Sequence, residues 1–172
     1  MIGVLRNLRN KLLLRQAVRA GLRLGGNVRI MGRPDFGSEP YLIEIGDHVT
    51  ISTGVTFLTH DGATWVFRDL PGYEGLQHFG RIYIGDNCFI VAGSIILPGG
   101  RIGSNSVVGA GAVVTRAVAD NSVVAGVPAR FICSYDEYIK RSAARCRFYA
   151  PEIAADRARL RELLLTELPD AG

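Results

Sequence analysis

Aliphatic residues recur at every sixth position between Ile84 and Ala119. This stretch reads as six hexads: IGDNCF, IVAGSI, ILPGGR, IGSNSV, VGAGAV and VTRAVA. Each hexad begins with Ile or Val, and its fifth position holds a small or medium-sized residue. This period fits neither the helical repeat of about 3.6 residues nor the simple alternation of an isolated strand. It predicts an all-β solenoid of parallel strands, whose coils stack the aliphatic positions into one buried column.

The fourth position of the hexad is expected to form the corners of the coil. It is Asn or Gly in five of the six hexads, and these two residues enter left-handed backbone conformation at the lowest cost. The rhythm also occurs earlier, in a first coil from Leu24 and again from Ile45 as IGDHVT, ISTGVT and FLTHDG. Between these two stretches the period breaks, and Phe36 to Leu42 is predicted to be a loop.

A longer interruption runs from Ala63 to Tyr83 and is rich in aromatic residues. A loop of this length without a strong pattern of its own is uncommon in a compact domain and is usually functional. It could equally be an arm that packs on a neighbouring subunit, and the two interpretations are compatible.

Both ends of the chain favour helices. Val4–Leu22 has apolar residues close to helical spacing, with arginines between them. We favour a helix that caps the open end of the solenoid; the alternative is a basic amphipathic helix that makes peripheral contact with an anionic membrane. After Arg130 we expect a short helix at Ser134–Arg147. A second helix, Glu152–Leu168, should be opened by Pro151 and pack against the solenoid or another subunit.

The predicted organisation is therefore an N-terminal cap helix at residues 1–23, a solenoid domain at 24–130 that includes the loop 63–83, and a C-terminal helical extension at 131–172. The 172 residues suit a single domain with its own core. The chain has no apolar run of transmembrane length and no evident signal peptide, so we expect a cytoplasmic protein.

The charge distribution argues against nucleic-acid binding. The net charge is +4, but residues 1–24 hold six basic and no acidic residues, which leaves −2 for the remainder. The three cysteines have no metal-binding spacing. Cys88 falls on an inward position, so we interpret it as a packing residue rather than a nucleophile.

With these hexads, and with GVPAR at Gly126–Arg130 closing the coil, residues 24–130 resemble the hexapeptide-repeat acyltransferases. The likeness is strongest to the maltose/galactoside acetyltransferase branch and to relatives that acylate sugars of surface polysaccharides. The resemblance implies a left-handed parallel β-helix, a handedness that the period alone does not give, since crossovers are normally right-handed. It also implies a homotrimer with active sites between chains, and acetyl-CoA as co-substrate without a metal.

His60, in FLTHDG, is the candidate catalytic residue. It occupies a fourth, corner position, where its side chain should point outward, and the aromatic loop follows it directly. His48 also occupies a corner, but only His60 matches the histidine that the resembled family uses as general base. A neutral imidazole can take the proton of a sugar hydroxyl as its oxygen attacks the thioester. No acyl-enzyme is required.

The remaining site residues are weaker candidates. On the acceptor side, Asp61 is a ligand for a hydroxyl group, with solvation of a corner as its alternative, while Trp65 could stack on a sugar ring and Arg68 and His78 could bind polar substituents. For the co-substrate, the resemblance implies six further residues: Phe89, Ala92, Ala110, Thr115, Arg116 and Arg130. Many relatives have tryptophan in place of Phe89, and some have serine in place of Ala92. With alanine at position 92, a hydroxyl contact to CoA is lost.

Three alternatives remain open at this point. An N-acetyltransferase acting on an amino sugar would need the same base and thioester. A non-catalytic solenoid scaffold would need neither His60 nor GVPAR. A metal-dependent carbonic anhydrase on this fold would need three histidines converging on zinc. The chain has three, His48, His60 and His78, but without close pairing.

Overall fold

A computed structural model of the protein describes residues 12–168. It divides into two compact units, one ending at Tyr138 and one beginning at Ile139. Residues 12–19 are helical, and the part of the expected N-terminal helix before residue 12 lies outside the described residues. Leu14, Ala17 and Leu22 pack against the core of the first unit, which favours the cap interpretation of this helix.

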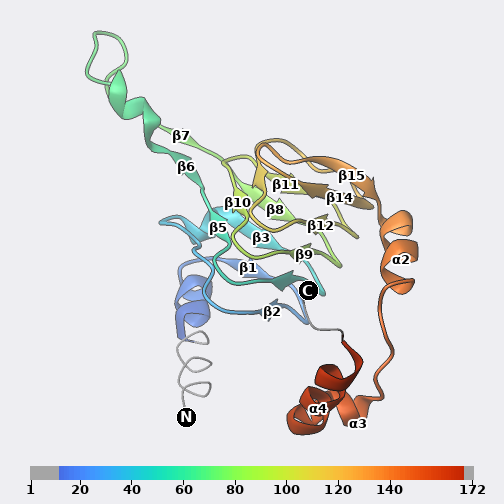
Figure 1. The fold of residues 1–172 in the computed structure, drawn as a ribbon. Coiled ribbons are helices and arrows are strands. Elements are labelled where there is room, and N and C mark those ends of the chain that lie inside the picture. Colours follow the sequence, from blue (N-terminus) through green and yellow to red (C-terminus); the bar gives the residue numbers. More distant parts are fainter. Residues whose placement is uncertain (1–11, 169–172) are drawn as a thin grey trace. The chain divides into compact units, whose positions relative to one another are not determined.

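The first unit is built around three sheets of short strands that are almost entirely parallel (Figure 1). Sheet A contains β1 (Arg23–Leu24), β3 (Ile43–Ile45), β8 (Ile82–Ile84) and β11 (Arg101–Ile102). Sheet B contains β2 (Arg29–Ile30), β4 (Thr50–Ile51), β9 (Phe89–Ile90), β12 (Val107–Val108), β14 (Ser122–Ala125) and β15 (Arg130–Ser134). Sheet C contains β5 (Thr56–Phe57), β10 (Ile95–Ile96) and β13 (Val113–Val114).

From β3 to β13 the chain passes through these three sheets in the cyclic order A, B, C, so each circuit forms one coil. Isolated bridges take the place of a strand in the first and last coils, where Asp35 pairs with Thr56 of sheet C and Val118 pairs with Ile102 of sheet A. Ile84 pairs with Ile102, Ile90 with Val108 and Ile96 with Val114, in each case 18 residues further on. Three hexads therefore make one coil. This pairing confirms the stacked parallel coils that the hexads predict.

The aliphatic first positions of the hexads form the core. All six, from Ile84 to Val114, are at most 1% exposed. They continue into the earlier coils through Ile45, Ile51 and Phe57, which are equally buried. Burial of an aliphatic side chain contributes about 1.5–3 kcal/mol, so this column contributes substantially to the stability of the first unit.

The predicted corners have the expected backbone conformation. Asn87, Gly93, Gly99, Asn105 and Gly111 have φ values between 54° and 80°. His48 has φ 55° and forms a corner as well. At the A–B corners the side chains stack from coil to coil, since Asn87 Nδ2 donates to Asn105 Oδ1 (2.8 Å) and Asn105 Nδ2 donates to Asn121 Oδ1 (3.0 Å).

Three expectations about the boundaries are wrong in part. The coil does not simply end at Arg130, because β15 turns back and pairs antiparallel with β14. The expected loop Ala63 to Tyr83 is an excursion from residue 60 to residue 81, and Tyr83 already belongs to β8. The expected helix Glu152–Leu168 consists of α3 (Pro151–Ala155) and α4 (Arg157–Glu167). Asp156 separates them because its carboxylate caps α4 through the N–H groups of Ala158 and Arg159.

The helix expected at Ser134–Arg147 is α2 (Tyr135–Ala143). In the second unit, Arg147 donates to Glu167 across 2.9 Å and so ties the segment before α3 to the end of α4. No helix within residues 12–168 combines the length and the apolar character that crossing a bilayer requires.

Candidate functional site

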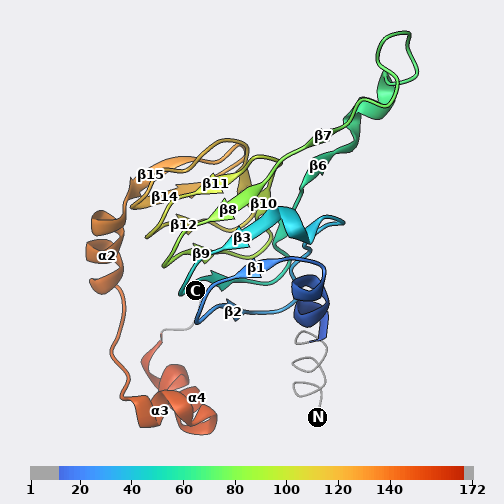
Figure 2. The same cartoon turned by 180° about the vertical axis from the view of Figure 1, so that it is seen from behind.

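A two-stranded ribbon leaves the coil between sheets C and A. It consists of β6 (His60–Asp61) and β7 (His78–Phe79), which pair antiparallel, and it projects from the solenoid (Figures 1 and 2). The 3-10 helix η2 (Gly62–Val66) begins directly after β6. We call residues 60–81 the arm. The aromatic interruption seen in the sequence is thus an ordered excursion anchored at its base by His60.

His60 does not occupy a left-handed corner, contrary to the sequence interpretation. It is an extended residue of β6, because the chain departs from the coil here instead of turning to the next side. Its side chain is 45% exposed, so the expected outward orientation is confirmed. Its Nδ1 lies 3.0 Å from Glu39 Oε2, and its ring packs against Phe79 with the centroids 5.8 Å apart.

Glu39 is the site residue that the sequence did not reveal. Its Oε2 also accepts a hydrogen bond of 2.5 Å from the hydroxyl of Thr59, a residue only 1% exposed. These two hydrogen bonds, first from Thr59 and then from His60, lower the pKa of Glu39 below its ordinary value. Glu39 is therefore an ionised acceptor that fixes the orientation of the imidazole.

The Glu39 contact also defines the tautomer that suits catalysis. With Nδ1–H donating to the carboxylate, a neutral His60 carries its lone pair on Nε2. Within the described part of the chain, Nε2 has no hydrogen-bond partner. An exposed, oriented imidazole with a free nitrogen is what a general base needs.

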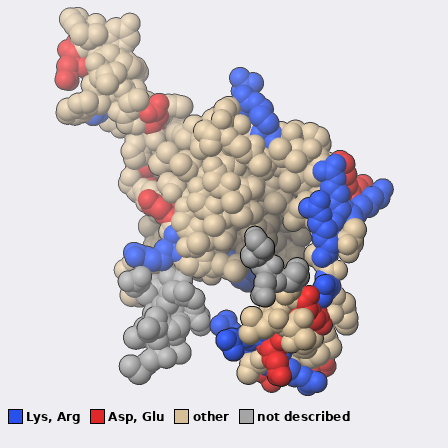
Figure 3. Space-filling model, in the orientation of Figure 1, with Lys and Arg blue, Asp and Glu red and all other residues tan. Residues whose placement is uncertain are grey.

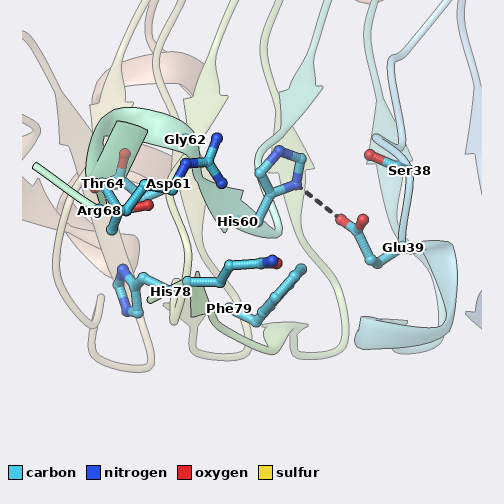
Figure 4. Close-up of a pocket in the computed structure, with 10 residues that line it drawn as sticks. Ser38, Glu39, His60, Asp61, Gly62, Thr64, Arg68, His78 and Phe79 are labelled. Carbon is cyan, nitrogen blue, oxygen red and sulfur yellow. Dashed lines mark hydrogen bonds and ion pairs between the residues drawn. The ribbon is translucent and has the colours of Figure 1, made fainter. Parts of the chain in front are cut away.

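The imidazole opens onto a cavity of about 340 Å³ at the base of the arm (Figure 4). Besides Glu39 and His60, its lining includes Asp61, Arg68, His78 and Phe79. The structure therefore brings together four of the five predicted catalytic and acceptor-side residues. The fifth, Trp65, does not line this cavity; it is 67% exposed, and its ring lies 4.5 Å from the guanidinium carbon of Arg68.

Asp61 has a local structural role. Its Oδ1 accepts the backbone N–H of Ala63 (2.8 Å) and caps η2. The carboxylate still borders the cavity. A contact of its second oxygen with an acceptor hydroxyl stays a prediction.

The three histidines do not converge within the described chain. His60 and His78 lie on the arm, whereas His48 Nδ1 lies 2.9 Å from Asn87 Oδ1 at a solenoid corner. Among residues 12–168, no group of three His, Cys, Asp or Glu side chains is arranged to hold a metal ion. The three histidines, all within residues 12–168, therefore do not form the ligand set that the carbonic anhydrase alternative requires.

The residues predicted to bind the co-substrate fall into two groups. Thr115, Arg116 and Arg130 line one depression of about 340 Å³, together with Ala129 and Phe131. Thr115 follows β13 at the same edge of sheet C at which His60 follows β5. Since β13 lies two strands from β5, the strands are about 10 Å apart.

The other three lie on sheet B and its corner with sheet C. Ala92 and Ala110 occupy equivalent corners of successive coils, where Gly111 N–H donates to Ala92 O (2.9 Å). Phe89 is half-buried on the outer face of β9, in register with Thr50 and Val107. None of these three lines the depression around Arg130.

Cys88 is a packing residue, as its hexad position indicates. It is 3% exposed, and its Sγ contacts the carbonyl oxygen of Gly103 at 3.1 Å. Burial raises the pKa of this thiol to about 11. A neutral, buried thiol is a poor nucleophile.

Comparison with known proteins identifies the family. Residues 81–116 match the family model described as the hexapeptide repeat of succinyl-transferase. Protein CapG of Staphylococcus aureus is 48% identical over 120 residues, which is 69% of this chain and 69% of CapG. The chain belongs to the hexapeptide-repeat acetyltransferase family. The resemblance and the acetyltransferase class predicted from the sequence are thereby confirmed.

Two solved structures extend the comparison. A maltose O-acetyltransferase from Clostridium difficile 630 has a TM-score of 0.55 and 35% identity, over 64% of this chain and 57% of that one. A galactoside acetyltransferase in complex with coenzyme A has a TM-score of 0.55 and 30% identity, over 74% of this chain and 60% of that one. The chain thus spans about three fifths of the length of both.

Proposed function

We propose that the protein transfers an acetyl group from acetyl-CoA to a hydroxyl group of a sugar, within a surface polysaccharide or its precursor, with His60 as general base. The observation that carries this proposal is the Thr59–Glu39–His60 arrangement. It holds the imidazole with Nδ1 on a carboxylate, at the wall of a cavity that His60 lines. The names of the two solved relatives, a maltose and a galactoside acetyltransferase, support a sugar acceptor.

The reaction needs little beyond this base. His60 Nε2 takes the hydroxyl proton while the oxygen attacks the thioester carbonyl, and a tetrahedral oxyanion forms. The oxyanion collapses, the carbon–sulfur bond breaks, and the thiolate of CoA recovers the proton from the imidazolium. The Glu39 carboxylate, hydrogen-bonded to Nδ1, stabilises that imidazolium. General-base catalysis of this kind contributes about 10²–10⁴-fold.

The depression at Thr115, Arg116 and Arg130 is suited to the nucleotide end of CoA. Two exposed arginines can pair with phosphates, and Ala129 and Phe131 supply apolar surface for an adenine. The site and His60 lie along one edge of the solenoid, so an extended pantetheine chain could join them. Binding of coenzyme A by the galactoside acetyltransferase relative supports this assignment.

Two further features of the proposal follow from the family. The coil is left-handed, and three chains pack around a threefold axis so that the co-substrate lies between neighbours. An uncharged surface supports such packing, since the solenoid presents a broad face without Lys, Arg, Asp or Glu (Figure 3). We place the reaction in the cytoplasm, where acetyl-CoA is available.

The decisive experiment measures release of free CoA from acetyl-CoA in the presence of a panel of sugars and glycans. We expect His60→Ala to lower kcat by about 10²–10⁴-fold while CoA still raises the melting temperature. His48→Ala is the matched control, a histidine outside the cavity, and should turn over normally. Equal activity of His60→Ala and wild type would remove His60 from the mechanism. Mass spectrometry of the product distinguishes an O-acetyl from an N-acetyl group.

A further inference from the structure

The acidic and the basic side chains that line the cavity differ in whether they have a partner within the protein. Both carboxylates are already hydrogen-bonded within the protein: Glu39 accepts from Thr59 and faces His60, while Asp61 caps η2. Arg68, the arginine on this wall, forms no salt bridge with a described residue. The cavity therefore contains a cation whose hydrogen-bonding capacity is unused.

The surrounding residues hold Arg68 in place. Its backbone N–H donates to Thr64 O (2.9 Å) just beyond η2, and its guanidinium carbon lies 4.5 Å from the ring centroid of Trp65. The residues on either side of Arg68 also pack together, because the rings of Phe67 and Tyr73 make an edge-to-face contact with their centroids 5.6 Å apart. The guanidinium is thus supported by the arm, and the residue is half-buried although the arm projects into solvent.

Stacking leaves the useful edge of the guanidinium available. A guanidinium that lies over an aromatic ring uses its face, and its N–H groups remain free in the plane. In Figure 4 the Arg68 side chain extends into the space in front of His60. Planar N–H pairs match the two oxygens of a carboxylate or a phosphate in bidentate geometry.

We propose that the acceptor is an anionic sugar, whose negatively charged oxygens bind Arg68 while a nearby hydroxyl meets Nε2 of His60. This inference rests on the proposed acetyl transfer and specifies its acceptor. The anion is a carboxylate of an acidic sugar or a phosphate attached to the sugar, since both offer the same oxygen pair to the guanidinium. Arg68 is then a specificity-determining residue, and Trp65 contributes by positioning it instead of stacking on a sugar.

Matched acceptors test the proposal. Wild type is assayed with a methyl hexuronide and the corresponding neutral methyl hexoside, and with a hexose 1-phosphate and the free hexose. We expect kcat/KM to favour at least one anionic member over its neutral partner by about tenfold or more, as expected for a charge-assisted bidentate contact. The pair that shows the preference identifies the source of the anion.

Two variants assign the preference to Arg68. Arg68→Gln should reduce the anionic preference in kcat/KM to about twofold or less by raising KM for the anionic acceptor, and Arg68→Lys should retain part of the preference. Arg101→Gln is the control, because Arg101 also lies 4.5 Å from an aromatic centroid, that of Tyr83, but lines a different depression.

Two results would overturn the inference and leave the proposed function intact. One is a wild-type enzyme with equal kcat/KM for the neutral and the anionic sugars. The other is an anionic preference that survives in Arg68→Gln. Absence of turnover with every acceptor, neutral ones included, would instead contradict the proposed function itself.

Discussion

At the scale of single residues, the proposed function depends on one carboxylate that contacts two neighbouring side chains. Glu39 Oε2 accepts the hydroxyl of the buried Thr59 at 2.5 Å and lies 3.0 Å from His60 Nδ1. Thr59 immediately precedes His60 in the chain, so Glu39 holds both the backbone at the start of the arm and the imidazole. In the proposed mechanism the acid is a positioning residue that acts through His60 and does not touch the reacting atoms.

Replacing this acid should lower the rate without weakening substrate binding. We expect Glu39→Gln to reduce kcat about 10–100-fold, part of the general-base contribution, because the amide no longer stabilises the imidazolium or selects its tautomer. KM for the acceptor should change little. Glu44→Gln is the control, since Glu44 forms an exposed pair with Arg23 on sheet A. A Glu39→Gln variant with wild-type kcat would show that the contact has no catalytic role.

The same contact predicts a pH dependence of stability. The pKa of Glu39 is lowered in the folded protein, chiefly by the Thr59 hydroxyl. An acid whose pKa is lower in the folded than in the unfolded protein stabilises the fold above its unfolded pKa, which is about 4.3 for Glu. This contribution is lost as the pH falls through the pKa of the folded state. Urea unfolding of wild type and Glu39→Gln should therefore show a difference in free energy at about pH 5. The difference should shrink as the pH falls below about 4. A difference independent of pH would contradict this assignment.

Thiol chemistry offers a separate check on the core. Cys88 and Cys133 are buried, and burial raises the pKa of Cys88 to about 11, whereas Cys146 is exposed. We expect a thiol reagent at neutral pH to modify Cys146 in the native protein and the other two cysteines only in denaturant. Labelling followed by peptide mass spectrometry measures this. Modification of native Cys88 at the rate of Cys146 would exclude its place in the core.

At the scale of elements, the A–B corners form a side-chain ladder along the coil. His48, Asn87, Asn105 and Asn121 follow one another with contacts of 2.9, 2.8 and 3.0 Å, and all four have φ between 54° and 57°. This position requires a left-handed backbone and a side chain that can hydrogen-bond to the coils on both sides. Asparagine satisfies both requirements, because it tolerates the left-handed conformation and its amide both donates and accepts.

Two substitutions separate these demands. Asn105→Gly keeps the backbone accessible but removes two side-chain hydrogen bonds, which should cost about 1–2 kcal/mol. Asn105→Ala removes the same bonds and adds left-handed strain of about 1–2 kcal/mol, which exceeds the entropic cost of glycine. We therefore expect the alanine variant to be the less stable of the two by about 0.5–1 kcal/mol. Urea unfolding measures both, and an alanine variant as stable as the glycine variant would contradict the strain argument.

The sequence predicted the repeating coils and the places where the repeat is interrupted, but not the structure and contacts of the interrupting segments. The buried column and the Asn and Gly corners follow from local spacing, so every coil from Ile84 to Val114 was predictable. Glu39 was not, because it lies in the break at residues 36–42 and meets His60 only through a contact 21 residues away in the chain. The ribbon β6–β7 and the antiparallel β15 were missed for the same reason. Each is a reversal of chain direction with no hexad signature.

At the scale of the whole molecule, the outer faces of sheets A and C differ in character. On sheet A, Arg23, Glu44, Tyr83 and Arg101 stand in register on the outer face. On sheet C, the corresponding positions are Thr56, Ile95 and Val113, all half-buried in the isolated chain. An apolar outer face beside a charged one predicts that sheet C, and not sheet A, is covered in the proposed trimer.

A charge on each face tests this arrangement. Ile95→Lys should convert the oligomer to monomers, since an unpaired ammonium is costly to bury, and should weaken stabilisation by CoA because the proposed co-substrate site needs a neighbour. Tyr83→Lys places the same charge on sheet A and should leave the assembly intact. Light scattering gives the mass, and far-UV circular dichroism verifies that both variants retain the fold. A wild-type monomer, or an Ile95→Lys variant with the wild-type mass and CoA response, would remove sheet C from the interface. If the wild type is a monomer, its active site has to be complete within a single chain.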